Sequence, residues 1–242
     1  MSNKGRHLTE IVKLSRDSTS KANMQNINPD DQSPDHWAIR KSFLPPIPEL
    51  EEVADLLSEA VDAILRDDLP LAARLIVEAD IEAVGQYAAQ ISGPISAVVH
   101  RYRDVGDPPI IKDRAKQRMP SSSTEREIFE RDGWRCRVCD TRIISKKSIR
   151  KMHAILPDEA RQGRRAIDCH YGMSAICVSL DHLLPHSRGG TNNPDNLVTA
   201  CGPCQFGRNN WTFAEVGIED PRGRAPIVDE WDGLTRIEAL KV

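Results

Sequence analysis

Residues 179–204 read SLDHLLPHSRGGTNNPDNLVTACGPC, and this stretch decides how the second half of the chain can fold. An Asp-His pair at 181–182 is followed by a Gly-Gly pair at 189–190, by Asn196 and by cysteines at 201 and 204. These features follow one another within 24 residues (181 to 204). An isolated Asp-His pair is usually structural, but this order and this proximity predict a site that carries out chemistry.

Two pairs of cysteines have the spacing of metal ligands, Cys136-Arg-Val-Cys139 and Cys201-Gly-Pro-Cys204. This spacing lets both thiolates of a pair bind one zinc ion from a tight turn. A redox role is the alternative, yet neither pair has the strand-to-helix setting of a thioredoxin-like motif. We therefore expect a structural zinc ion held by all four cysteines. Cys169 and Cys177 are too far apart for a further pair, and we expect both in the core.

The residues before the second cysteine pair suit phosphodiester hydrolysis. That reaction needs a base that activates water, a divalent cation that neutralises charge on the phosphate, and donors that hold the backbone. His182 offers the base, because an ordinary imidazole titrates at about pH 6.5, and Asp181 offers a ligand for the cation. Successive side chains of a regular strand point to opposite faces, so a ligand beside a base predicts a twisted or bulged backbone.

The order Asp181-His182, Gly189-Gly190, Asn196 and Cys201-x-x-Cys204 resembles the HNH endonuclease family, also called the His-Me finger or ββα-metal nucleases. The resemblance covers about residues 124–210. It implies two strands that carry the Asp-His and Asn elements, and a helix that supplies the remaining contact to a catalytic magnesium or manganese ion. It also implies that Asn196 orients the base or its loop.

The helix after Cys204 departs from the family pattern. Gln205 stands where the family usually has Asn or His. Its amide oxygen can coordinate magnesium, although the extra methylene moves the contact. Asn209, one helical turn later, is the alternative ligand. We therefore expect Asp181, Gln205 and Asn209 to hold the catalytic cation, and zinc to remain structural.

Three further residues of this region are candidates for contact with nucleic acid. His186 follows the Asp-His pair, Arg188 precedes the glycines, and Arg208 stands at a position that is commonly basic in the family. Arginine suits phosphate because its guanidinium can donate two parallel hydrogen bonds. The alternative for each of the three is an ordinary surface or packing residue.

Charge is distributed unevenly along the 242 residues, whose formal net charge is −3. Residues 131–170 hold eleven Lys or Arg against five Asp or Glu, a net charge of +6, whereas residues 49–82 hold two against eleven, a net charge of −9. Basic regions attract phosphate backbones. We expect DNA as the partner, with RNA not excluded.

Nothing in the sequence indicates a membrane. No stretch approaches the roughly 20 apolar residues that a membrane span needs, and residues 1–10 lead into no secretory signal. We expect a cytoplasmic protein with no membrane partner. The cytosol keeps thiols reduced, which favours cysteines as metal ligands over disulfides.

Apolar periodicity in the first half and the resemblance in the second together imply an α+β chain, with a helical N-terminal region followed by a zinc-stabilised ββα-metal (HNH) finger domain. Residues 1–48 are polar and end in a Pro-rich stretch, which predicts a partly disordered arm. Residues 49–103 are expected to form a helical module and residues 104–123 a linker. The HNH domain is expected over 124–242, with an insertion at about 143–176 and a C-terminal tail that wraps it.

Apolar spacings of three and four predict two helices in the module, one from Glu49 and one from Leu71 to about Ile91. They form a structural core or bind a partner, which would be a second copy of the chain or another protein. At the start of the expected HNH domain, the capping box Thr124-x-x-Glu127 predicts a helix that ends at Gly133.

The insertion is expected to hold a helix from Ser145 to Leu156 with a basic side. We expect that side to lie along the nucleic acid, although an ordinary solvated face is the alternative. Its residues are Lys146, Lys147, Arg150 and Lys151. In the tail, Trp211, Phe213 and Trp231 either pack in the core or stack on bases, and we favour the core.

Taken together, the sequence predicts a metal-dependent endonuclease that hydrolyses DNA, with His182 as general base. The alternative is an adaptor that keeps the zinc fold and binds DNA without cleaving it, because Gln205 has weakened the metal site. A toxin or phage-defence effector would differ in its biology and use the same chemistry.

Overall fold

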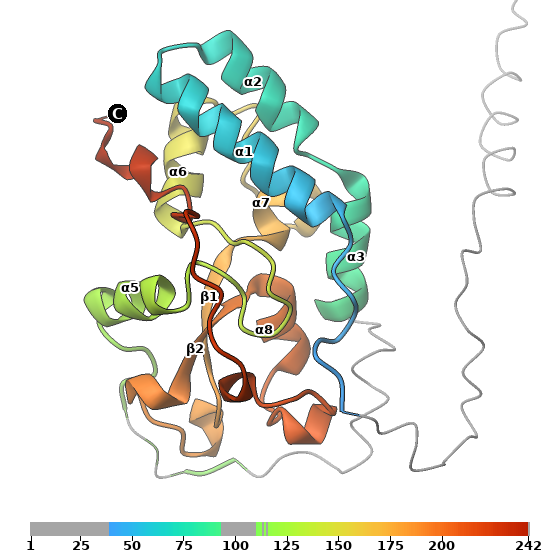
Figure 1. Ribbon diagram of the computed structural model, residues 1–242, viewed down its shortest axis with the longest axis vertical. Coiled ribbons are helices and arrows are strands. Elements are labelled where there is room, and N and C mark those ends of the chain that lie inside the picture. The colour runs from blue at the N-terminus through green and yellow to red at the C-terminus, as the bar shows by residue number, and fades with distance from the viewer. Residues whose placement is uncertain (1–38, 93–109, 113, 115, 242) are drawn as a thin grey trace, which may run out of the picture. The chain divides into compact units, whose positions relative to one another are not determined.

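Two short strands form a hairpin in the lower half of Figure 1. β1 (Val178–His182) pairs antiparallel with β2 (Leu197–Cys201), and the register sets Asp181 opposite Val198 and His182 opposite Leu197. α8 (Gly202–Arg208) follows β2 directly. Almost every residue of the two strands is buried, because α5 and α8 pack against them. The ββα order and the α+β class expected from the sequence are confirmed.

The computed structural model describes residues 39–92, 110–112, 114 and 116–241. Most of the arm expected at 1–48 and part of the linker expected at 104–123 lie outside the described residues. No helix among the described residues is both long enough and apolar enough to span a membrane.

The described part of the chain begins with the helices α1 (Glu49–Leu65), α2 (Leu69–Glu78) and α3 (Glu82–Ser92). The sequence predicted a single helix from Leu71 to about Ile91, and the structure instead breaks it between α2 and α3. The break brings Asp80 into the turn, where its Oδ1 accepts a hydrogen bond from the Tyr171 backbone N at 2.7 Å. Tertiary contact therefore overrides helix propensity at this point.

Between α3 and β1, the described residues also form the helices α5 (Ser122–Arg131), α6 (Lys146–Ile155) and α7 (Tyr171–Ala175). α5 begins earlier than predicted, because Ser121 and not Thr124 caps it: Ser121 Oγ accepts a hydrogen bond from the Thr124 backbone N at 3.2 Å. Gly133 follows the helix with a φ of +65°, as a helix-ending glycine should. The helix predicted from Ser145 to Leu156 is confirmed to within one residue at each end.

Residues Ile39–Val242 form one compact unit. α3 packs against α7 and α8, and α1 packs against α7, so α3 lies directly on the helix of the ββα element. The boundaries expected between module, linker and HNH domain remain predictions, as does a partner for the helices. Their apolar stripes belong to the common core.

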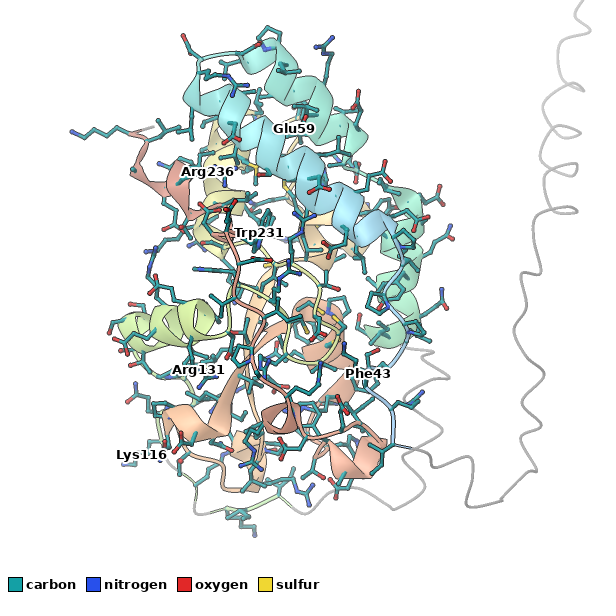
Figure 2. The ribbon with its side chains drawn as sticks, viewed as in Figure 1. Phe43, Glu59, Lys116, Arg131, Trp231 and Arg236 are labelled. Carbon is teal, nitrogen blue, oxygen red and sulfur yellow. The ribbon has the colours of Figure 1, made fainter. Side chains whose placement is uncertain are left out.

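Residues after α8 run back across the molecule to α1. Arg40 pairs with Ile218 in an isolated bridge, and Arg236, labelled in Figure 2, donates from its Nε to Asp62 Oδ1 at 2.8 Å. Trp231, also labelled, donates from its Nε1 to the Ile143 backbone O at 2.9 Å. Trp211 and Phe213 are buried, in agreement with the expected core role.

Cys169 and Cys177 differ from expectation, since both are only partly buried. Cys169 lies in a turn, where its Sγ accepts a hydrogen bond from the Gly163 backbone N at 3.3 Å. Its sulfur therefore serves local turn geometry and does not fill a core position.

Candidate functional site

Cys136, Cys139, Cys201 and Cys204 come together as one cluster. Their sulfur atoms all lie within 4.8 Å of one another, and all four residues are buried. The Sγ atoms of Cys139 and Cys201 are 3.8 Å apart. Four sulfurs at about 2.3 Å from a tetrahedral zinc ion are separated by about 3.8 Å, so the cluster fits zinc.

The local backbone conformation brings the two thiols of each cysteine pair close together. In the first pair, the Asp140 backbone N donates to the Cys136 O at 2.8 Å, and Asp140 takes a φ of +62°, which closes a tight turn. In the second pair, Cys201 ends β2 and Cys204 lies in the first turn of α8. The strand and the helix therefore place two thiols at one point.

The thiols strongly influence one another. Hydrogen bonds, that to Cys136 first, lower the pKa of the Cys139 thiol, whereas interaction with Cys136 raises the pKa of Cys201 and of Cys204. Four thiolates so close together repel one another unless a cation lies between them. This donor chemistry also favours a metal ion.

His182 lies at the end of β1, is buried, and lines a cleft of about 940 Å³. Burial is the main cause that lowers the pKa of its imidazole, and Arg118 and His186 act in the same direction, while Asn192 and Asp181 oppose them. The neutral ring, which can accept a proton, is therefore favoured at physiological pH.

Asn192 fixes the tautomer of this histidine. The amide Nδ2 of Asn192 donates to the Gln117 backbone O at 3.1 Å, which leaves its Oδ1 toward His182 Nε2 at 2.9 Å. A carbonyl oxygen only accepts, so Nε2 carries the hydrogen and Nδ1 keeps the lone pair. Asn192 could not be identified from the sequence, because nothing there distinguishes it from Asn193.

The loop that carries Asn192 is shaped by two glycines. Gly189 has a φ of +89°, and a Cβ on Gly190 would lie 1.7 Å from the Leu184 backbone O. Asn196 holds the same loop: its Oδ1 accepts from the Leu184 backbone N at 2.9 Å, and its Nδ2 donates to the Thr191 backbone O at 2.9 Å. Asn196 thus contacts the loop backbone and not the His182 ring.

Asp181 and Arg208 form a buried ion pair. Arg208 Nε donates to Asp181 Oδ2 at 2.8 Å, and its Nη2 donates to Asp181 Oδ1 and to the His182 backbone O. Arg208 is 1% exposed, and its guanidinium lies over the Phe213 ring. Burial raises the pKa of the Asp181 carboxyl, and Arg208 opposes that shift.

The ion pair between Asp181 and Arg208 affects whether Asp181 can bind the catalytic cation that was expected from the sequence. Both Asp181 oxygens are engaged by Arg208, and Gln205 is also engaged, with Oε1 on Ser179 Oγ and Nε2 on the Leu180 backbone O at 2.9 Å. Asn209 lies exposed at the end of α8. The charge of Asp181 is already balanced, so as placed these three residues do not fit a magnesium ion. Among the described residues, the four cysteines are the only group of three or more His, Cys, Asp or Glu side chains arranged for a metal.

The cleft beside His182 collects residues from several elements. Asp181, His186 and Gln205 line it together with Phe206 from α8. The segment that precedes α5 also lines the cleft, through Lys112, Arg114, Lys116 and Arg118. The sequence had predicted a linker for that segment.

The comparisons with known proteins agree with this arrangement. A family model described as HNH endonuclease matches residues 168–205. The chain carries an HNH domain. No curated protein and no solved structure matches the chain. The matched HNH segment contains Asp181, His182, Asn196 and the second cysteine pair, whereas Cys136 and Cys139 join the zinc cluster from outside it.

The other residues expected to contact nucleic acid lie in different environments. His186 is buried and faces His182, with ring centroids 6.0 Å apart. Arg188 donates to Glu215, and Arg208 is turned inward to Asp181, so neither presents a free guanidinium to solvent. On α6, Lys146, Lys147 and Arg150 are exposed, while Lys151 Nζ donates to the Leu240 backbone O at 2.6 Å. None of these four α6 residues lines the cleft.

Proposed function

We propose that this protein is an HNH nuclease that hydrolyses DNA phosphodiester bonds, with His182 as the general base. The observation that carries the proposal is the state of this histidine. It is buried beside the cleft, and Asn192 occupies its Nε2, which leaves Nδ1 to accept a proton. The HNH match supports a nuclease-type activity and a nucleic-acid substrate.

In the proposed reaction, His182 Nδ1 takes a proton from a water molecule in the cleft. The water oxygen forms a bond to phosphorus, and the ester bond to the leaving oxygen breaks. The leaving oxygen takes a proton from solvent. Asn196 acts as a positioning residue, since its three loop contacts hold the segment between β1 and β2 that carries Asn192.

Positive charge around the cleft stabilises the phosphate in this scheme. Lys116 and Arg118 are exposed and line the cleft with His182, and the His186 ring lines the same cleft with its centroid 6.0 Å from that of His182. Cations fixed in place before the reaction stabilise charge that develops on the phosphate.

Members of the HNH family generally use a divalent metal ion. Magnesium or manganese held by Asp181, Gln205 and Asn209 was expected from the sequence, but the first two are engaged within the protein. No step is therefore assigned to that ion. Zinc has a structural role in this proposal, since its four thiol ligands are buried.

A second candidate is a DNA-binding protein without catalysis. The observation in its favour is the same ion pair: Arg208 occupies the carboxylate of Asp181, and Gln205 stands at the ligand position on α8. Such a protein would keep the cleft, the zinc cluster and DNA affinity.

Purified protein incubated with supercoiled plasmid tests the two candidates. The reaction is run with magnesium, with manganese and without added metal, and in parallel with labelled RNA of matched sequence. We expect nicked or linear plasmid with the wild-type protein and none with His182→Ala. Binding of the plasmid without cleavage under all conditions would favour the non-catalytic candidate.

A further inference from the structure

Four cations from a single short segment line the cleft. Lys112, Arg114, Lys116 and Arg118 alternate with other residues, all four are exposed, and all four line the cleft that contains His182. We call this set the basic strap. The four cations are spaced two residues apart in the sequence, and each of them lines this cleft.

The strap is tied to the loop between β1 and β2 at two points. The Ile111 backbone N donates to the Ser187 O at 2.9 Å, and the Gln117 backbone O accepts from Asn192 Nδ2 at 3.1 Å. In Figure 1 the segment runs below the hairpin into α5, and Figure 2 labels Lys116 on it, far from Glu59 of α1. The four cations are thereby held beside the base.

No carboxylate among the described residues pairs with any cation of the strap. This distinguishes them from Arg188 and Arg208, which are engaged by Glu215 and Asp181. Four cations held close together repel one another, and a polyanion relieves that repulsion. A phosphate backbone fits this surface.

Phe206 adds an apolar element to the cleft. It lies on α8 beside Gln205 and is 69% exposed, although large aromatic side chains usually pack in a core. An exposed aromatic ring in the same cleft as several cations is the combination that binds single-stranded nucleic acids, with bases stacked on the ring and phosphates on the cations.

We propose that the cleft binds a nucleic-acid strand, with the basic strap on its phosphates and an unpaired base stacked on Phe206. The proposal builds on the nuclease function above and names the substrate class: single-stranded or locally unpaired DNA. It also moves the principal phosphate contacts from α6 to the strap.

The strap is tested with Lys112, Arg114, Lys116 and Arg118 all changed to Gln. The matched control changes four exposed cations that do not line the cleft to Gln: Arg66, Arg74, Arg164 and Lys241. Both sets are made in a His182→Ala background, so that binding of a labelled oligonucleotide is measured without cleavage, over a range of salt concentrations. We expect the strap variant to bind at least about tenfold more weakly and with a smaller salt dependence, since each lost phosphate contact lowers the slope by roughly 0.7–0.9. The control should keep the parent slope.

Phe206→Ala and Phe206→Tyr test the stacked base. With a single-stranded oligonucleotide, the Ala variant should bind roughly 5- to 150-fold more weakly, whereas the Tyr variant should bind like the parent, because stacking needs only an aromatic ring. With a fully paired duplex of the same sequence, Phe206→Ala should make little difference.

Two results would overturn the inference: a strap variant that keeps the parent affinity and salt slope, or a Phe206→Ala variant whose single-strand affinity is unchanged or falls equally for duplex. If binding is lost instead when Lys146, Lys147 and Arg150 of α6 are replaced, the phosphate contacts lie on α6. Failure of the proposed nuclease function gives a different result from failure of this inference: the wild-type protein would then bind single strands through the strap and cleave none.

Discussion

Arg208 and Asp181 join α8 to β1 through a two-pronged ion pair that is almost completely removed from solvent. The same guanidinium also bonds to the backbone O atoms of His182 and Trp211. One side chain thus fixes the helix, the strand and the backbone of the candidate base. The sequence predicted either a phosphate contact or an ordinary surface charge for Arg208, and the structure gives it this internal partner instead.

Removing Arg208 should destabilise the fold. Arg208→Gln leaves the Asp181 carboxylate buried without its partner, which typically costs about 3–5 kcal/mol. Urea denaturation followed by tryptophan fluorescence measures the free energy of unfolding. Arg208→Gln combined with Asp181→Asn should be more stable than Arg208→Gln alone, because the uncompensated charge is gone. A single variant within about 0.5 kcal/mol of wild type would show that the pair is not formed in solution.

Asn192 should affect the rate of cleavage more than the affinity for DNA. Asn192→Ala frees the His182 ring to rotate, and a misplaced base typically lowers the rate about 10- to 100-fold. Asn192→Asp places a carboxylate at Nε2, which raises the pKa of His182 and should move the acid limb of the pH–rate profile to higher pH. Rates from single-turnover cleavage across pH test both changes. An unchanged profile in Asn192→Asp would contradict the contact.

His170 should make the fold sensitive to acid. Its Nε2 lies 2.7 Å from the Ile76 backbone O and its Nδ1 accepts from the Met173 backbone N, so the buried ring is neutral. Burial lowers its pKa below the ordinary 6.5. The unfolded chain therefore binds the proton more readily, and stability that is complete above pH 6.5 is lost as pH falls toward the folded-state pKa. Urea midpoints at pH 7.5 and 5.5 should differ less in His170→Gln than in wild type, and an equal difference would contradict this role.

The protein should bind one zinc ion that stabilises the fold. Cys136→Ser should remove the zinc and lower the free energy of unfolding by about 3 kcal/mol or more. Cys169→Ser and Cys177→Ser are the matched controls, since both lie outside the cluster, and both should retain the metal. Elemental analysis of the purified protein gives the stoichiometry. Zinc retained by Cys136→Ser at the wild-type level would contradict the four-thiol site.

The sequence was sufficient for the parts of the fold that depend on local spacing. Each cysteine pair lies within one tight turn, and the ββα order follows from motifs inside 24 residues (181 to 204). The helix from Ser145 was also predictable, because its cap and its terminating Pro157 are adjacent to it in sequence.

The rest depended on contacts between distant residues. An arginine is usually exposed, so no sequence pattern showed that Arg208 turns inward. The basic strap has the composition of a linker, and only its position against the Asn192 loop brings it to the cleft. The break before α3 likewise depends on Asp80 meeting Tyr171, which is 91 residues away.

The central claim is that His182 removes the proton from the attacking water. Single-turnover cleavage of a labelled single-stranded oligonucleotide, with protein in excess, measures this step directly for wild type and for His182→Ala. We predict that the variant binds the oligonucleotide with an affinity near that of wild type and cleaves it about 10²- to 10⁴-fold more slowly. Cleavage by His182→Ala at the wild-type rate would contradict the claim.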